Sequence, residues 1–271
     1  MTTTAATDWT AVEPPSFRLD GRLAVITGSS DGLGRTFALA FAQVGATVLL
    51  TARRKERLDE VKAAIEAKGG KAHVFPADLS NLEDIDGLAA EATKLARASG
   101  DHLVLVNNAG FGYTVPALKT TEEDWDKIFD TQAKATFFCC QKMAPLMIER
   151  GYGKIINLTS TWGFSSDMGK VAYGSAKAAI ARITAGLSTE WAPLGVRVNA
   201  LAPTATLSDF TRGTMAANPE RANRLVSHIK LGRFAEMSDH IGPAIFLASA
   251  ASDFVTGHTL FSDGGWHGAS F

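Results

Sequence analysis

Cysteine is scarce in this chain of 271 residues, and the two that occur, Cys139 and Cys140, are adjacent within an apolar run. Neighbouring cysteines cannot build a framework of disulfides, so the sequence indicates a reducing compartment. The first 20 residues lack a basic start followed by an apolar run, and no run approaches the roughly 18 apolar residues of a membrane span. We therefore expect no signal peptide, no membrane helix and a cytoplasmic location.

An excess of one charge is also lacking, because 27 Lys and Arg face 28 Asp and Glu, and the sequence pI is about 6.6. This balance gives no support to binding of nucleic acid or of a membrane surface. No block of like charges indicates an interaction tail, and no metal site is predicted. With 46% hydrophobic and 20% charged residues, the chain suits one soluble globular domain with a large core, or two small ones.

What the sequence does contain is a regular alternation of strand-like and helix-like segments. Residues 1–18, with three consecutive Thr and a Pro pair, predict a flexible or strapped-on arm. Short apolar runs then predict strands at 23–27, 47–51, 72–77, 103–106, 154–158, 196–198 and 258–261. Amphipathic patterns between them predict helices at 37–44, 54–68, 82–98, 125–149, around Tyr173 and at 241–250.

This alternation predicts an α/β fold, in which right-handed βαβ units build a parallel sheet covered by helices on both faces. Residues 203–233 are less regular than the rest. No linker interrupts the rhythm, so residues 19–271 are expected to form a single domain that carries the cofactor and substrate sites together.

The segment TGSSDGLG, residues 27–34, lies between the first predicted strand and the first predicted helix. Glycines here allow a tight turn and let the backbone approach a pyrophosphate, which then rests on the helix N-terminus. An ordinary Gly-rich βα turn is the alternative, but the position between strand and helix favours dinucleotide binding. Three residues separate Gly28 from Gly32, which departs from the usual G-x-G-x-x-G spacing.

Tyr173 and Lys177 lie four residues apart, so a helix places them on one face. A phenol is a poor acid-base catalyst at neutral pH because its unperturbed pKa is about 10. An ammonium group one turn away favours the phenolate and lowers that pKa toward the working range. A surface Tyr beside a surface Lys would have the same spacing, so the pair alone is weak evidence for a site.

Taken together, these segments resemble the short-chain dehydrogenase/reductase family over residues 19–265. The resemblance is carried by TGSSDGLG, NNAG at 107–110, Ser160, Tyr173, Lys177, Asn199 and DGG at 263–265. It implies a single-domain, Rossmann-like three-layer sandwich with a seven-stranded parallel sheet. It also implies NAD(P)-dependent hydride transfer between a nicotinamide cofactor and a carbonyl or secondary alcohol.

The resemblance assigns chemistry to three residues. Tyr173 would be the general acid that protonates the carbonyl oxygen, and Lys177 would hold the nicotinamide ribose and lower the pKa of Tyr173. Ser160 would hydrogen-bond the substrate oxygen and orient it, whereas its alternative role is to cap the loop after a strand. Thr159 and Thr161 flank Ser160, so the choice rests on its position thirteen residues before the Tyr.

Arg53 and Arg54, after the second predicted strand, offer guanidinium groups to a 2′-phosphate, which favours NADP(H) and leaves NAD(H) possible. The alternative is two solvated charges at a helix start, and Asp31 in the Gly-rich turn is a mild counter-indication. Asp78 either lies near the adenine, as the resemblance implies, or serves the start of the next helix. The residues expected to bind the cofactor are Gly28, Ser30, Asp31, Gly32, Leu33, Gly34, Arg53, Arg54, Asp78, Leu79, Asn108, Ala109, Gly110, Tyr173, Lys177, Pro203, Thr204, Thr206 and Ser208.

Two positions depart from the family pattern. Thr204 follows Pro203 where the family has Gly, which bears on the geometry of that loop, and the hydroxyl expected five residues after the Pro is Ser208. Gln132 stands where the family has the Asn of its proton relay, so it is either a modified relay residue or an ordinary helical Gln. A non-catalytic nucleotide-binding regulator is therefore an alternative to an enzyme.

The side chains near the expected substrate site allow two classes of substrate. An apolar or ring-bearing ketone, and hence a carbonyl reductase, is favoured by Phe111, Tyr113, Trp162, Phe164 and Met168, although aromatic residues are more often plain core. A sugar acid or a 3-oxoacyl thioester would instead meet Arg212, Arg221 and Arg224, in or beside the stretch 207–224. The family's habit of pairing its long helices implies a homodimer or homotetramer.

Overall fold

The computed structural model of the chain describes residues 13–268. Most of the predicted arm, residues 1–12, lies outside this range. In the described remainder of the arm, the ring of Phe17 lies with its centroid 6.5 Å from that of Phe246. Just beyond it, the backbone N–H of Leu19 donates to the carbonyl oxygen of Val44. The part of the arm that the structure describes is therefore attached to the body of the protein.

A seven-stranded sheet forms the centre of the structure, and every pair of neighbouring strands in it is parallel. In spatial order its strands are β3 (Lys71–Val74), β2 (Thr47–Thr51), β1 (Arg22–Thr27), β4 (His102–Asn107), β5 (Gly153–Leu158), β6 (Val196–Pro203) and β9 (Thr259–Ser262). The strand order reverses direction between β1 and β4, which is where ligands bind in open α/β sheets. The predicted α/β fold is thus confirmed.

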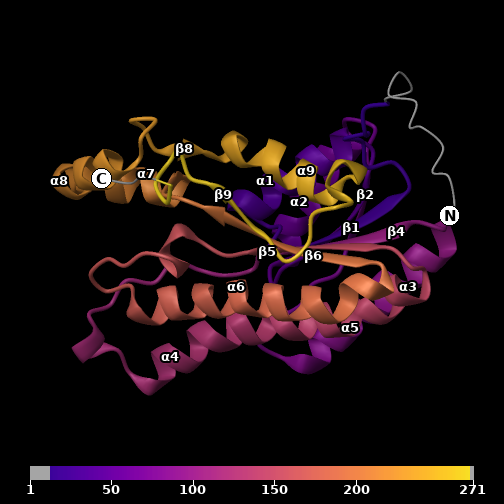
Figure 1. Cartoon of the computed structure of the whole chain (residues 1–271), viewed down its shortest axis with the longest axis horizontal. Helices are drawn as coiled ribbons and strands as arrows, with labels where there is room; N and C mark the ends of the chain where they lie inside the picture. Colours follow the sequence, from indigo (N-terminus) through magenta and orange to yellow (C-terminus); the bar gives the residue numbers. More distant parts are fainter. Residues whose placement is uncertain (1–12, 269–271) are drawn as a thin grey trace, which may run out of the picture.

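Helices cover both faces of the sheet (Figure 1). One face carries α1 (Gly32–Gln43), α2 (Lys55–Glu66) and α9 (Ile241–Ala248), and the other carries α3 (Leu82–Ser99), α5 (Ala135–Glu149) and α6 (Val171–Trp191). Successive side chains of β1 alternate between the two layers, because a strand directs neighbouring residues to opposite faces. Leu23 and Val25 join the cluster under α3, α5 and α6, whereas Ala24 and Ile26 join the cluster under α1, α2 and α9.

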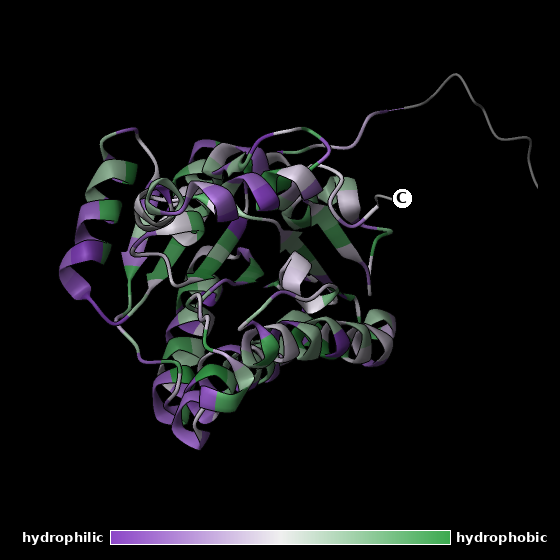
Figure 2. Ribbon diagram, turned by 90° about the vertical axis from the view of Figure 1, so that its left-hand side faces the viewer, coloured by the Kyte–Doolittle hydropathy of each residue, from purple (hydrophilic) through white to green (hydrophobic). Residues whose placement is uncertain are grey.

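The hydropathy of the chain follows this layering. In Figure 2 the strands are mostly green, and purple segments lie mainly in the helices around them. Strand β4 has the burial pattern of a strand enclosed on both faces, because all of its residues from Leu103 to Asn107 are buried. Within residues 13–268, no helix is both long enough and apolar enough to cross a bilayer.

Two helices differ from their predicted bounds for local reasons. Helix α1 begins at Gly32 rather than near Phe37, because the carboxylate of Asp31 accepts a hydrogen bond from the backbone N–H of Gly32 and caps the helix. The helix predicted over 125–149 is interrupted. It consists of α4 (Glu122–Phe129), a π-helical turn at Asp130–Lys134, and α5.

The less regular stretch after β6 is more ordered than the sequence predicts. It contains β7 (Thr206–Leu207), α7 (Asp209–Ala217) and α8 (Pro219–His228), and β7 pairs in parallel with β8 (Ala235–Glu236). The N-caps of the two helices are Ser208 and Asn218, whose side chains accept hydrogen bonds from backbone N–H groups of the first turn. Because this segment directly follows β6, α7 and α8 lie beyond the carboxyl end of the sheet (Figure 1).

Candidate active site

The Gly-rich turn after β1 is packed directly against the loop after β4. Gly28 has a φ of 66°, and a Cβ added there would lie 2.9 Å from Cα of Ala109. A Cβ on Gly34 would collide with the carbonyl oxygen of Gly28. Glycine is therefore required at both positions, since any side chain would separate the turn from the loop or from the start of α1. The result is a shallow backbone floor that ends at a helix N-terminus.

Thr27 fastens the same two loops together. Its Oγ1 accepts hydrogen bonds from the backbone N–H groups of Asn108 and Ala109, both at 2.9 Å. In return, Nδ2 of Asn108 donates to the carbonyl oxygen of Thr27 at 2.9 Å. Asn108, Ala109 and Gly110 thus lie beside the Gly-rich turn, in the arrangement expected for the floor of a dinucleotide site. Thr27 therefore positions the two loops. It belongs to the segment TGSSDGLG but is not among the residues that the sequence predicts to bind the cofactor.

The residues expected around the pyrophosphate and adenine take different roles. Asp31 caps α1, and the side chains of Leu33 and Leu79 pack against the core. Asp78 accepts hydrogen bonds from Oγ and N of Ser80, at 2.8 and 3.1 Å, and these bonds lower the pKa of its carboxyl. These bonds agree with the alternative considered for Asp78, a role in the turn before α3, although the side chain of Asn81 is the one that caps that helix.

Arg53 and Arg54 are exposed where the chain leaves β2. Neither guanidinium makes an ion pair with another side chain in the part of the chain that the structure describes, whereas most nearby charges on α2 are paired. The charge of Arg53 contributes to the lowered pKa of Asp78, so the two side chains are near each other across the ends of β2 and β3. Two unpaired guanidinium groups at this edge match the anion-binding position that the sequence predicts.

Tyr173 and Lys177 lie one turn apart near the start of α6, and Nζ of Lys177 is 5.7 Å from the centroid of the Tyr173 ring. The ammonium group donates to the carbonyl oxygen of Leu158, at the end of β5, at 2.8 Å. Oγ1 of Thr159 donates to the carbonyl oxygen of Lys177 at 2.7 Å. These two bonds tie the first turns of α6 to the carboxyl end of β5 and hold the Tyr–Lys pair against the sheet.

Burial dominates the acidity of this pair. It raises the pKa of the Tyr173 phenol to about 12, while the Ser160 hydroxyl acts in the opposite direction. It also lowers the pKa of Lys177 to about 8, since a low-dielectric site disfavours the charged form of each group. The net shift of Tyr173 is therefore opposite to the direction that the sequence predicts. Desolvation of the phenol outweighs the opposing effect of the Ser160 hydroxyl.

Ser160 lies at the end of β5, next to the phenol of Tyr173, and is largely buried. Its Oγ also accepts a hydrogen bond from the backbone N–H of Trp162 at 3.2 Å, so the capping role considered as its alternative is present as well. The neighbouring hydroxyl of Thr159 instead donates its hydrogen bond to the carbonyl oxygen of Lys177. Because Ser160 has a hydroxyl proton that the Trp162 contact leaves unused, capping is compatible with orienting a substrate oxygen.

Gln132 lies in the π-helical turn between α4 and α5 and is completely buried. Its Nε2 donates to the carbonyl oxygen of Phe111 at 3.3 Å, but its Oε1 is buried without a hydrogen-bond partner among the described residues. A Cβ added to Gly110 would lie 3.3 Å from that Oε1. The amide is therefore directed at the loop after β4 rather than at solvent. A π-turn of this kind often occurs at a functional position.

The residues after β6 use most of their polar groups locally. Oγ1 of Thr206 donates to the carbonyl oxygen of Thr204 at 2.8 Å and contacts Nε2 of His240 at 2.9 Å. Ser208, predicted to contact the cofactor, forms a reciprocal cap with Thr211 at the start of α7. Thr204 is buried, and its Oγ1 has no partner in the described part of the chain.

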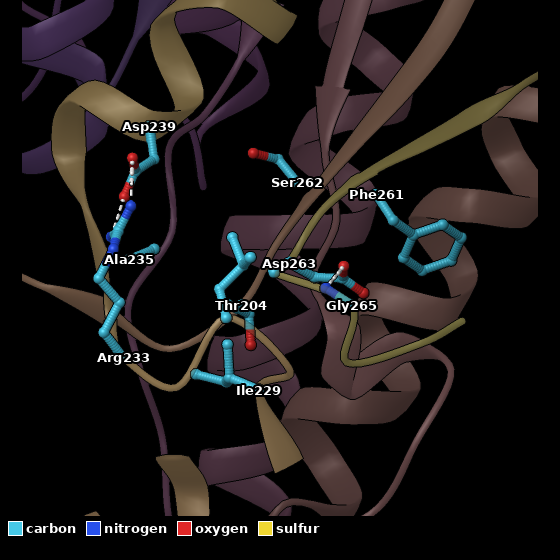
Figure 3. Close-up of a pocket in the computed structure, with 11 residues that line it drawn as sticks. Thr204, Ile229, Arg233, Ala235, Asp239, Phe261, Ser262, Asp263 and Gly265 are labelled. Carbon is cyan, nitrogen blue, oxygen red and sulfur yellow. Dashed lines mark hydrogen bonds and ion pairs between the residues drawn. The ribbon is translucent and has the colours of Figure 1, made fainter. Parts of the chain in front are cut away.

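A cavity of about 340 Å³ opens beside Thr204, between the ends of β6 and β9. Figure 3 shows its lining, in which Arg233 and Asp239 form an ion pair at 2.6 Å on one side and Phe261 and Asp263 lie on the other. Its lining includes neither Ser160 nor Tyr173. The space beside Thr204 is thus distinct from the Tyr–Lys pair.

The aromatic residues predicted to line the substrate site are mostly engaged in packing. Trp162 packs edge-on against Trp266 with centroids 5.2 Å apart, and Phe164 packs edge-on against Phe261 at 4.9 Å. Phe111 and Tyr113 pack against a small buried cluster between α4 and α6, and Met168 is 81% exposed. The chain uses these side chains to hold the loop after β5 and the loop after β4 in place.

Charged residues near the same loops are arranged differently. Arg212 pairs with Glu236 at 2.6 Å, whereas Arg224 pairs with Asp167 at 3.1 Å, in the loop that precedes α6. Lys170 is the last residue of this loop, and its Nζ is 5.2 Å from the centroid of the Tyr173 ring. We did not predict a role for Lys170 from the sequence. Its spacing of three residues before Tyr173, which puts the two on one side of a helical turn, was the available signal.

The residues at this edge of the sheet fit a nicotinamide dinucleotide. The glycine floor admits a pyrophosphate next to the start of α1, and the unpaired Arg53 and Arg54 lie at one end of the edge, after β2. At the other end, Tyr173 and Lys177 lie after β5, with the unpartnered amide oxygen of Gln132 beside the loop after β4. Gly28 directly follows β1, and Tyr173 and Lys177 lie in the helix after β5; only β4 separates these two strands in the sheet.

Comparisons with known proteins agree with this arrangement. The family model described as short chain dehydrogenase matches residues 22–219. Gluconate 5-dehydrogenase of Gluconobacter oxydans is 36% identical over 93% of this chain and 97% of its own length. A 3-oxoacyl-acyl-carrier-protein reductase of Staphylococcus aureus is 34% identical over 90% of this chain and 97% of its own.

The structure is also similar to solved ones. A gluconate 5-dehydrogenase of Burkholderia cenocepacia, in complex with NADP and tartrate, superposes with a TM-score of 0.87 at 33% identity, covering 94% of this chain and 98% of that one. The family match, the identities, the seven-stranded sheet and the Ser160, Tyr173 and Lys177 arrangement therefore lead to one conclusion. The chain belongs to the short-chain dehydrogenase family, and it is an oxidoreductase that acts on CH–OH or C=O groups.

Proposed function

We propose that the protein is an NADP(H)-preferring dehydrogenase that interconverts a secondary hydroxyl and a ketone on a sugar acid. The observation that carries the reaction is the Tyr–Lys pair fixed at the end of β5 beside Ser160 and next to a glycine floor. The preference for NADP(H) is supported by Arg53 and Arg54, whose guanidinium groups lack carboxylate partners among the described residues.

The chain's own groups supply the proton chemistry. Because the pKa of Tyr173 is raised to about 12, the phenol is protonated at neutral pH and can donate its proton to a carbonyl oxygen during reduction. Ser160 would hydrogen-bond the same oxygen and stabilise the charge that develops on it. Lys177 uses one of its three N–H groups on Leu158, so two remain to hold ribose hydroxyls. The nicotinamide, when bound, supplies or accepts the hydride.

The sugar-acid class is preferred over an apolar ketone for two reasons. The residues predicted to form an apolar lining are used in packing instead. Among the relatives, several are named for gluconate or 2-dehydro-3-deoxy-gluconate, and one solved relative holds tartrate, which is a hydroxy acid. A 3-oxoacyl thioester is the second candidate, because a 34% identical relative is named for that reaction.

The proposal is tested by steady-state kinetics with NADP⁺ and NAD⁺ against D-gluconate, 2-dehydro-3-deoxy-D-gluconate, a cyclic secondary alcohol and a 3-hydroxyacyl thioester of N-acetylcysteamine. The expected result is the highest kcat/KM with NADP⁺ and one of the two sugar acids. A higher kcat/KM on the thioester would support the second candidate instead. No turnover of any substrate, in a protein that binds NADPH, would favour a non-catalytic nucleotide-binding regulator.

A further inference from the structure

Lys170 carries a charge that no carboxylate in the described part of the chain neutralises directly. Its Nζ donates to the carbonyl oxygen of Tyr113 at 2.9 Å and to Oγ1 of Thr114 at 2.7 Å, and both acceptors are uncharged. An ammonium group has three donors, so one N–H is left for another acceptor. Lys170 is half-buried, where an unpaired charge is costly unless an anion accompanies it.

A second cation without an ion-pair partner lies on the neighbouring helix. Arg221 is on α8, and its Nε is buried without a hydrogen-bond partner among residues 13–268. The proximity of Arg221 to Lys170 is expressed in the pKa of Lys170, which burial and then the charge of Arg221 lower to about 8, while Asp167 acts in the opposite direction. Two cations that weaken each other's charged state are stabilised by an anion placed between them.

The ion pair of Arg224 with Asp167 holds this arrangement together. Arg224 is one turn after Arg221 on α8, so the two side chains share a face of that helix. Asp167 lies three residues before Lys170, and its side chain is only 13% exposed. The pair therefore joins α8 to the loop before α6. The single carboxylate of Asp167 pairs with Arg224 and also acts on Lys170, so it balances only part of the positive charge of Lys170, Arg221 and Arg224.

We propose that Lys170 and Arg221 form the subsite that binds the carboxylate of the substrate, and that this subsite selects acids over uncharged polyols. The proposal rests on the sugar-acid function proposed above and adds the residues that would recognise the acid. Lys170 lies beside the Tyr173 ring, at 5.2 Å from Nζ to the centroid, so a carboxylate held there belongs to a molecule whose other end can reach the phenol. Guanidinium and ammonium groups are the donors that bind carboxylates most strongly.

The test compares matched substrates that differ in the carboxylate. The kcat/KM values for 5-keto-D-gluconate and for its uncharged counterpart, L-sorbose, are measured with NADPH for the wild type, Lys170→Met, Lys170→Arg and Arg221→Met. The binding of D-gluconate to the NADPH complex is measured separately by calorimetry. Arg97→Gln is the matched control, because Arg97 lies on α3 and is paired with Glu149 on α5.

Lys170→Met and Arg221→Met should each lower kcat/KM for the keto acid about 10- to 100-fold, the range of a charge-assisted hydrogen bond, and change it less than about threefold for the uncharged ketose. Lys170→Arg should restore most of the acid preference, and Arg97→Gln should leave the ratio unchanged. Equal losses on acid and ketose in Lys170→Met would mean that Lys170 only supports the loop at Tyr113, and would overturn the proposal.

The binding measurement separates failure of this subsite from failure of the proposed function. Gluconate that binds the wild type and not the two Met variants, without any turnover of sugar acids, would support the subsite and contradict the proposed reaction. Sugar-acid turnover by the wild type with unchanged acid preference in both Met variants would support the reaction and contradict the subsite. Absence of both binding and turnover would contradict both.

Discussion

The side-chain amide of Gln132 donates from Nε2 to the carbonyl oxygen of Phe111 at 3.3 Å and leaves its Oε1 buried without a partner among the described residues. A buried amide oxygen of this kind is costly unless it meets a donor, such as a water that passes protons from the Lys177 side of the site. Gly110 approaches this amide closely, since an added Cβ would lie 3.3 Å from Oε1.

The first prediction follows from this amide. Gln132→Leu should lower kcat by about tenfold or more and shift its pH profile, which is less than the roughly 10²–10⁴-fold effect of losing a general acid. Gln132→Asn should keep or raise kcat, because it retains the donor and acceptor on a shorter side chain. Both are measured by pH–rate profiles on proteins whose thermal unfolding is checked. An unchanged profile in a well-folded Gln132→Leu protein would mean that the residue has no relay role.

Tyr173→Phe should bind NADPH with near wild-type affinity and lose turnover by roughly 10²–10⁴-fold, because only the phenol oxygen that donates the proton is removed. Turnover is measured at saturating cofactor, and binding by the fluorescence of NADPH. Tyr152→Phe is a control for the loss of a hydroxyl, because the hydroxyl of Tyr152 donates a hydrogen bond to Asp253 and neither residue belongs to the candidate site. Near-normal turnover in a stable Tyr173→Phe protein would remove Tyr173 from the acid role.

Cofactor choice provides the third prediction. Arg53→Ala, or Arg54→Ala, should raise KM for NADP(H) by about tenfold or more and leave KM for NAD(H) nearly unchanged, because only NADP(H) carries the 2′-phosphate. Arg57→Ala is the matched control, since Arg57 lies in the first turn of α2, just after these two residues, and is paired with Glu60 at 2.9 Å. The ratio of kcat/KM for the two cofactors is the readout. A wild-type preference for NAD(H), or a ratio that neither variant moves, contradicts the assignment.

The sheet was predictable from the sequence because its strands are continuous apolar runs, and such runs are the pattern of strands buried on both faces. The break at Asp130–Lys134 was not predictable. No Gly or Pro marks it, and its residues are compatible with a continuous helix, so the π-turn at Gln132 reflects packing against the loop after β4. Helix propensity is a property of single residues, so it carries no information about the contact of Gln132 with the loop after β4.

The candidate catalytic residues were accessible to sequence analysis because a motif fixes Tyr173 and Lys177 within one helical turn. The cation pair was not, because it depends on segments far apart in the chain. Asp167 and Arg224 are 57 residues apart, and only the fold brings the loop before α6 and the helix α8 together. The same limit applies to the packing of Trp162 and Phe164, since their partners lie in the last strand and the segment after it.

The last prediction concerns the stability of the end of the sheet at acid pH. His240 is completely buried, with Nε2 at 2.9 Å from Oγ1 of Thr206 and Nδ1 at 2.8 Å from Oγ of Ser262. Burial lowers the pKa of its imidazole to about 4, and the nearby Asp239 only partly opposes this shift. In the unfolded chain the same side chain has a pKa of about 6.5.

Between these two values the unfolded chain binds a proton that the folded protein does not, so the free energy of unfolding falls as the pH falls from about 6.5 to about 4. Above about pH 6.5 this loss of stability is absent, and near pH 4 the free energy of unfolding is lower by on the order of 3 kcal/mol. His240→Gln keeps hydrogen-bonding capacity without a titratable group, so it should flatten this part of the profile. Urea unfolding at several pH values measures the slope, with exposed His73→Gln as the control. If the wild type and His240→Gln lose stability with the same slope between pH 6.5 and 4, the buried imidazole does not set the acid sensitivity of this protein.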